Sequence, residues 1–97
     1  MLFDNFFVID YAQRTVYFKN EEIPLLKKEF DIIEVLSQNP GQVFDKERLY
    51  ETAWGLDGLG NNTVVAEHIR KIRAKFASAG AKQYIETVWG VGYKWVK

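Results

Sequence analysis

Short apolar runs separated by polar turns fill the first 25 residues. Residues 6–10 and 15–18 are rich in aromatic and β-branched side chains, and a polar segment follows each run. A third run over residues 22–25 contains Pro24, which cannot donate a hydrogen bond to a neighbouring strand and therefore belongs at a sheet edge or a strand end. This pattern predicts an antiparallel meander of short strands.

From residue 27 the apolar positions recur at helical spacing. A first helix is predicted over residues 27–38, because the Asn-Pro-Gly segment 39–41 ends it. A second helix begins after Asp45, whose carboxylate can cap its first turn, and ends at Gly55. A third helix, capped by Asn61 or Asn62, extends to about residue 77. The predicted apolar faces are Phe30, Ile33, Val35 and Leu36; Leu49, Tyr50, Ala53 and Trp54; and Val65, Ile69, Ile72 and Phe76.

Two strand-like segments, residues 84–88 and 93–96, close the chain around the turn Trp-Gly-Val-Gly. The second and third helices form a helix-turn-helix, although the glycine-rich loop 55–61 is longer than the three or four residues usual for that motif. The whole predicts an α+β fold, a winged helix-turn-helix with an N-terminal antiparallel β-sheet, a three-helix core and a C-terminal β-hairpin wing. Trp54 and Trp95 are expected in the core, because an indole ring buries a large apolar area.

Length and composition exclude several classes of protein. Ninety-seven residues make one domain, 1–97, and the absence of cysteine excludes disulfides and thiolate metal sites. Because His68 is the single histidine, a histidine metal site or a Ser-His-Asp triad is disfavoured. Adjacent Glu67 and His68 point about 100° apart on a helix, which disfavours a small hydrolase using His68 with Glu67 or Asp57. We expect no cofactor, no metal and no enzymatic activity.

The chain shows no sign of a membrane segment or a secretion signal. No apolar run approaches the roughly 18 residues that a bilayer span requires, and the N-terminus lacks the layout of a signal peptide. A cytoplasmic protein without a membrane partner is expected.

Charge is unevenly distributed, although the formal net charge is zero. Residues 1–45 carry four basic and eight acidic side chains, whereas residues 46–97 carry nine basic and five acidic ones. The outward side of the third helix and its flanks carry Thr63, Ala66, Glu67, His68, Arg70, Lys71, Arg73, Ala74 and Lys75. Short residues near the N-terminal end and cations further along suit a helix in a DNA major groove. The zero net charge supports an alternative, a winged-helix protein–protein interaction module whose basic helix meets an acidic partner.

Over nearly its whole length the sequence resembles the OmpR/PhoB-type effector domains of bacterial two-component response regulators. The matching segments follow in the same order and spacing: residues 25–30, Leu-Leu-Lys-Lys-Glu-Phe; 39–44, Asn-Pro-Gly-Gln-Val-Phe; Leu49 with Trp54 and Gly55; 68–75; and 84–94.

The resemblance implies a sequence-specific module that regulates transcription and binds direct-repeat double-stranded promoter DNA as a tandem pair. It places the third helix in the major groove and the wing on the backbone or minor groove. It implies base contacts by Glu67 and Lys71, mainly phosphate or mixed contacts elsewhere on that helix, and backbone contacts by Lys46 and Trp54. His68 is equally compatible with a phosphate contact and with a hydrogen-bonded boundary position. The predicted DNA-binding residues are Lys46, Trp54, Thr63, Ala66, Glu67, His68, Arg70, Lys71, Arg73, Thr87, Trp89, Tyr93 and Lys94.

The resemblance also implies partners. A receiver domain is expected upstream in the full-length protein, together with a cognate sensor histidine kinase, so that phosphorylation acts by raising the local concentration of the effector domains. The loop containing Leu56, Asp57 and Leu59 corresponds to the segment that meets RNA polymerase.

Four positions depart from the family pattern. Leu26 replaces a common capping Thr, a loss of about 1 kcal/mol unless another group compensates. Thr63 stands where many relatives carry Arg, Val64 where many carry Thr, and Trp89 where many carry a wing Arg. Fewer phosphate contacts predict a shallower salt dependence and weaker DNA binding by the isolated domain.

Overall fold

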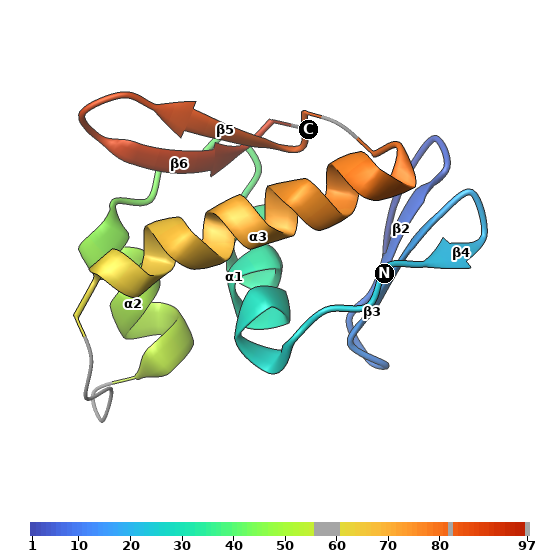
Figure 1. The fold of residues 1–97 in the computed structure, drawn as a ribbon, viewed down its shortest axis with the longest axis horizontal. Coiled ribbons are helices and arrows are strands. Elements are labelled where there is room, and N and C mark those ends of the chain that lie inside the picture. Colours follow the sequence, from blue (N-terminus) through green and yellow to red (C-terminus); the bar gives the residue numbers. More distant parts are fainter. Residues whose placement is uncertain (56–60, 82, 97) are drawn as a thin grey trace.

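The structure, a computed structural model, describes residues 1–55, 61–81 and 83–96. Its elements follow the order β1 (Leu2–Asp4), β2 (Phe7–Asp10), β3 (Thr15–Phe18), β4 (Glu21–Glu22), α1 (Lys27–Ser37), α2 (Lys46–Trp54), α3 (Thr63–Ala79), β5 (Ile85–Val88) and β6 (Gly92–Trp95). In Figure 1, α3 crosses the middle of the molecule, the β5–β6 hairpin lies along one side of it, and the N-terminal strands lie near its C-terminal end.

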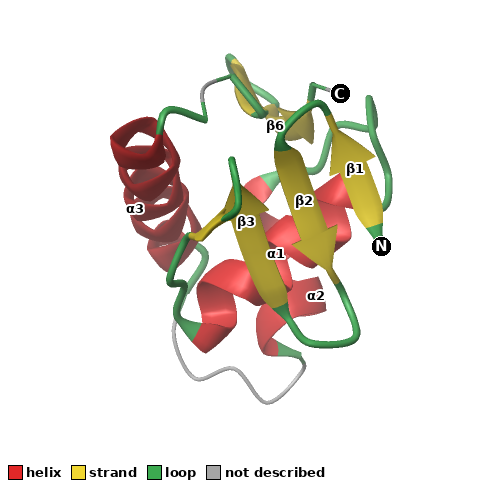
Figure 2. Ribbon diagram, turned by 90° about the vertical axis from the view of Figure 1, so that its right-hand side faces the viewer, coloured by secondary structure: helices red, strands yellow, loops and turns green. Residues whose placement is uncertain are grey.

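The N-terminal strands form an antiparallel meander in the order β1-β2-β3-β4. Phe7 and Ile9 are fully buried because alternate side chains of β2 point toward the helices, and Val16 pairs with Ile9 from β3. Figure 2 shows this sheet in front of α1. The meander is confirmed, with two corrections. β1 was not predicted, because three residues show too little alternation, and β4 ends at Glu22, before Pro24, rather than extending to residue 25.

All three predicted helices are present, with ends within two residues of those expected. The Asp45 carboxylate accepts a hydrogen bond from the Arg48 N–H at 2.7 Å, which confirms the predicted cap of α2. At the start of α3, Asn62 makes no side-chain cap, and Asn61 instead accepts from the Thr63 N–H at 3.0 Å. The predicted apolar stripe of α3 is fully confirmed, because all four of its side chains are buried.

α1 begins without a hydroxyl cap, as the Leu26 position predicts. Glu29 compensates in part, since its Oε1 accepts from the Leu26 N–H at 2.8 Å. The same oxygen lies 2.6 Å from Lys75 Nζ on α3, and the Glu29 side chain is completely buried. A buried carboxylate therefore joins α1 to α3.

An aromatic cluster holds the sheet, α3 and the hairpin together. The ring of Phe7 stacks on Tyr84 at 4.1 Å between centroids and meets Phe76 edge-on at 5.3 Å, and Trp95 lies 5.6 Å from Tyr84. Trp95 is fully buried, as predicted, whereas Trp54 is half-buried. Burial and the nearby Asp4 carboxylate raise the pKa of Tyr84 to about 12.

The hairpin is anchored to the segment before α2. The Phe44 N–H donates to the Tyr93 carbonyl at 2.8 Å, and the Tyr93 N–H donates back at 2.9 Å. Gly92 makes this approach possible, because a Cβ atom there would lie 2.7 Å from the Phe44 carbonyl carbon. The architecture is the predicted α+β winged helix-turn-helix. In the described part of the chain, no helix combines the length and apolarity needed to cross a membrane.

Candidate DNA-binding surface

The outward face of α3 carries the charged residues that its periodicity predicts. Glu67, Arg70 and Lys71 are exposed, and so is Thr63 in the first turn, while Ala66 is half-buried between them. The buried stripe on the opposite side fixes this orientation, because it packs into the core. The face is therefore available to a partner along most of the helix.

Glu67 lies at the centre of a small ionic network. Its carboxylate accepts from Arg70 Nη2 at 2.5 Å and from Arg70 Nε at 3.3 Å, and Lys71 Nζ lies 3.9 Å away. The hydrogen bond with Arg70 lowers the pKa of Glu67 and raises that of Arg70. These side chains are half-exposed or more, so the pairs add little to stability. In the unbound domain, Arg70 and Lys71 therefore both interact with the Glu67 carboxylate.

Arg73 does not extend to the outer surface of α3. Its guanidinium donates to the Ile85 carbonyl at 3.1 Å and to Thr87 Oγ1 at 2.8 Å, and it lies over the ring of Tyr93 at 5.6 Å from the centroid. Three residues predicted to contact DNA thus contact one another, and Tyr93 is buried. Their arrangement clamps the hairpin to α3.

His68 and Trp54 meet between α2 and α3. His68 Nδ1 donates to the Val64 carbonyl at 2.8 Å, since a carbonyl can only accept, and its ring meets Trp54 edge-on at 5.1 Å. Trp54 also stacks on Tyr50 at 5.2 Å. This hydrogen bond is the one expected if His68 is a hydrogen-bonded residue at the boundary of the core. A contact between His68 and a phosphate would have to use the other ring nitrogen, Nε2. The Glu67 carboxylate is hydrogen-bonded to Arg70, on the neighbouring turn of α3.

The tip of the hairpin presents apolar side chains to solvent. Trp89 is 88% exposed and Val91 56% exposed, whereas Lys94 is half-buried. Val91 was not among the predicted residues. Its sequence signal is its place between Gly90 and Gly92 in a tight turn, where a side chain has little core to enter.

A hollow of about 470 Å³ lies between this tip, the first residues of α2 and Asn62, the residue before α3. It contains Lys46, Thr87, Trp89 and Tyr93 from the predicted set. Its carboxylates already have partners: Asp45 caps α2, and Glu47 Oε2 accepts from Asn62 Nδ2 at 2.9 Å. With Lys46 as its one cation among the described lining residues, the hollow has a formal charge of −1.

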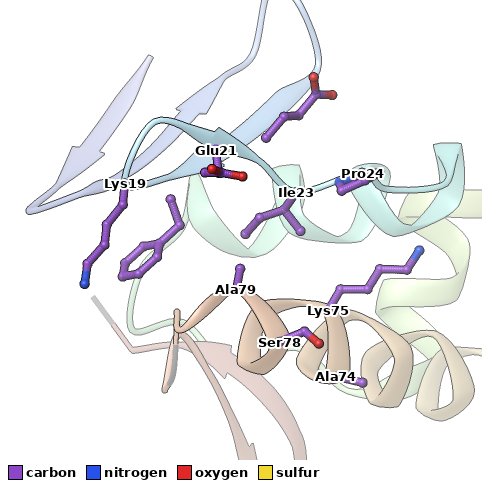
Figure 3. Close-up of a pocket in the computed structure, with 10 residues that line it drawn as sticks. Lys19, Glu21, Ile23, Pro24, Ala74, Lys75, Ser78 and Ala79 are labelled. Carbon is purple, nitrogen blue, oxygen red and sulfur yellow. The ribbon is translucent and has the colours of Figure 1, made fainter.

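A second hollow, of about 900 Å³, lies elsewhere. The segment from Phe18 to Pro24 faces Ala74, Lys75, Ser78 and Ala79 across it (Figure 3). It contains none of the residues predicted to contact DNA. Leu56, Asp57 and Leu59, predicted to meet RNA polymerase, lie outside the described residues.

Comparison with known proteins decides the family. A family model described as "Transcriptional regulatory protein, C terminal" matches residues 20–95. The chain belongs to this family of OmpR/PhoB-type DNA-binding domains. The transcriptional regulatory protein SpaR of Bacillus subtilis is 39% identical to this family member over 89 residues, which are 92% of this chain and 40% of SpaR.

Solved structures of response regulators share the fold of this OmpR/PhoB-type domain. The response regulator AdeR DNA-binding domain, solved in complex with an intercistronic region, gives a TM-score of 0.87 at 27% identity and covers 100% of this chain and 99% of that one. DrrB, an OmpR/PhoB homologue from Thermotoga maritima, gives 0.84 at 36% identity over 98% of this chain and 44% of DrrB. This domain therefore spans about two fifths of the length of SpaR and DrrB.

Proposed function

We propose that this chain is the output domain of a two-component response regulator, which binds promoter DNA sequence-specifically and regulates transcription. In this proposal α3 occupies the major groove and the wing contacts the backbone or minor groove, without enzymatic activity and in the cytoplasm. The observation that carries it is the exposed set Glu67, Arg70 and Lys71 on one face of α3, in a family of DNA-binding transcription regulators.

The dimensions and chemistry of α3 suit this role. A helix of 17 residues is about 25 Å long, and a B-DNA major groove is about 12 Å wide. The short side chains of Thr63 and Ala66 allow the first turns to approach the base edges. Glu67 can accept from a cytosine amino group, and Lys71 can donate to guanine. On binding, Arg70 exchanges its bond to Glu67 for one to a phosphate.

The contacts within the domain divide the predicted DNA-binding residues into two groups. Arg73, Thr87 and Tyr93 hold the wing at a fixed angle to α3, so we assign them mainly to positioning. Lys46, which is exposed at the first residue of α2, is left to contact the phosphate backbone, with Trp54 and Lys94 flanking the groove. A phosphate contact by His68 requires the doubly protonated ring, because the neutral ring uses its one N–H on Val64.

The partners of the full-length protein belong to the same proposal. The share of SpaR and DrrB that this domain spans leaves room in such proteins for a receiver domain, phosphorylated by a cognate sensor histidine kinase. Two effector domains brought together by receiver dimerisation would bind direct repeats in tandem, since linkage raises their effective concentration. The loop with Leu56, Asp57 and Leu59 would contact RNA polymerase.

The competing function is a protein-interaction module, and the zero net charge favours it. If the basic face of α3 binds an acidic protein instead of DNA, the domain should have little affinity for a generic DNA duplex. Salt dependence separates the two functions, because DNA binding releases one condensed counterion for nearly every phosphate neutralised.

The test is fluorescence anisotropy of the 97-residue domain with a labelled duplex, measured over a series of salt concentrations. Arg70→Ala/Lys71→Ala should weaken binding and reduce the slope of log K against log salt by about two units. Lys19→Ala/Lys27→Ala, which removes the same charge from the β3–β4 turn and the start of α1, should leave the slope unchanged. Absence of binding at low salt, or equal slopes in all three proteins, would favour the protein-interaction module.

A further inference from the structure

Trp89 is held in solvent by a well-defined turn. The Val91 N–H donates to the Val88 carbonyl at 2.9 Å, so Trp89 and Gly90 are the two central residues of a four-residue turn. Gly90 has a φ of 78°, which suits the second central position of a type II turn. The turn thereby projects the indole of Trp89, 88% exposed, with Val91 beside it.

Hydrogen bonds tie the base of the wing to the rest of the domain and so fix where the tip lies. Phe44 and Tyr93 exchange two backbone hydrogen bonds, and Arg73 ties Ile85 and Thr87 to α3. A tryptophan side chain in this position loses little further freedom when a partner covers it, because only two side-chain torsions remain.

The tip itself, residues 88–92, carries no charged side chain that could bind a phosphate. Among the described residues, the charged side chains of the wing and of the adjoining hollow are two basic and three acidic: Lys46 and Lys94 against Asp45, Glu47 and Glu86. Any affinity that the tip adds must therefore come from its apolar surface. Beside the phosphates, a duplex offers apolar surface in the sugar edges and base faces of the minor groove.

We propose that Trp89, supported by Val91, enters the minor groove as an apolar wedge against a base step, a proposal that rests on the DNA-binding function above. Apolar side chains that enter the minor groove partly unstack a base step and kink the duplex. The energy of this deformation depends on the step, and pyrimidine–purine steps such as TA and CA unstack most easily. Trp89 thus makes this domain prefer a flexible step under the wing, whereas an arginine there would prefer a narrow A-tract groove.

The test uses a duplex selected by the wild-type domain from a random library, with anisotropy measured across salt concentrations. Trp89→Ala should weaken binding about 5-fold to 100-fold, the range known for loss of one aromatic–base contact. Its salt slope should equal that of the wild type, because no phosphate contact is lost. Trp89→Phe should stay close to wild type, and Trp89→Arg should raise the slope by about one unit.

Two further measurements identify the contact. Replacing the flexible step under the wing by a stiff one should weaken wild-type binding more than binding by Trp89→Ala. Tryptophan emission should be quenched by DNA in the wild type and less so in Trp89→Phe, which separates Trp89 from Trp54. Phe3→Ala, which truncates an aromatic residue 69% exposed on β1, is the matched control and should bind like the wild type.

The outcomes separate this proposal from the proposed function. If the wild type binds DNA and Trp89→Ala binds equally well, the wedge is refuted while DNA binding stands. If Trp89→Ala binds one half-site normally and loses only tandem binding to two, the tip contacts the second copy and the wedge is again refuted. If the wild type binds no duplex at low salt, both proposals fail. Thermal melting of Trp89→Ala should match wild type, because the side chain has no core contact to lose.

Discussion

Gly92→Ala tests whether the wing depends on its contact with the segment before α2. A Cβ at this position would lie 2.7 Å from the Phe44 carbonyl carbon and 2.8 Å from the Asp45 Cα, and both are backbone atoms. Neither can rotate away as a side chain could. The substitution therefore has to move one of the two segments.

The cost follows from the bonds that this movement breaks. Normal carbon–carbon contact requires roughly 3.5 Å or more, and the new Cβ would lie closer still to the Phe44 carbonyl oxygen, so the segments must separate by about an ångström. The paired bonds of Phe44 and Tyr93, at 2.8 and 2.9 Å, would then exceed hydrogen-bonding distance. At about 0.5–1.5 kcal/mol for each bond, we expect a loss of about 1–3 kcal/mol, or roughly 10 °C in melting temperature for a domain of this size.

Calorimetry and urea unfolding measure the loss of stability, and amide hydrogen exchange locates it. The Phe44 and Tyr93 amides should lose protection in Gly92→Ala, and DNA affinity should fall because the wing is displaced. Gly90→Ala is the matched control: its φ of 78° imposes strain of about 1 kcal/mol, but a Cβ there meets no atom within 4 Å. Its Phe44 and Tyr93 amides should stay protected. Wild-type stability and wild-type protection in Gly92→Ala would refute the reasoning.

Two further predictions concern buried groups. The folded state raises the pKa of Tyr84 to about 12, above the ordinary value of 10, so the stability it contributes is complete below pH 10 and is lost as the pH rises toward 12. Urea unfolding at pH 9 and pH 11 should show a loss of about 1 kcal/mol in the wild type beyond that in Tyr84→Phe, and equal losses would contradict the assignment. Lys75→Met removes the charged partner of the buried Glu29 carboxylate and should cost about 1–3 kcal/mol. Glu29→Gln/Lys75→Met should recover part of that cost, and full stability of Lys75→Met alone would show that the pair is not coupled.

The elements that could be predicted from the sequence are those set by local physics. The apolar stripe from Val65 to Phe76 and the Asp45 cap depend on residues a few positions apart, and the structure confirms both. The exposure of Glu67 and Lys71 follows from the same periodicity, because burying one face of a helix turns the other outward. The order and spacing of short motifs also predict membership of the OmpR/PhoB-type family, and the family model that matches residues 20–95 confirms it.

Only the tertiary structure decided which elements meet. Glu29 and Lys75 are 46 positions apart, and nothing in either local pattern pairs them. Arg73 lies on the flank of α3 in any helical projection, but its partners, Ile85 and Thr87, depend on where the hairpin lies. Periodicity specifies the face on which a side chain lies and not the element that covers that face. Whether a cation is free for DNA or already bonded within the domain is therefore a property of the packed structure.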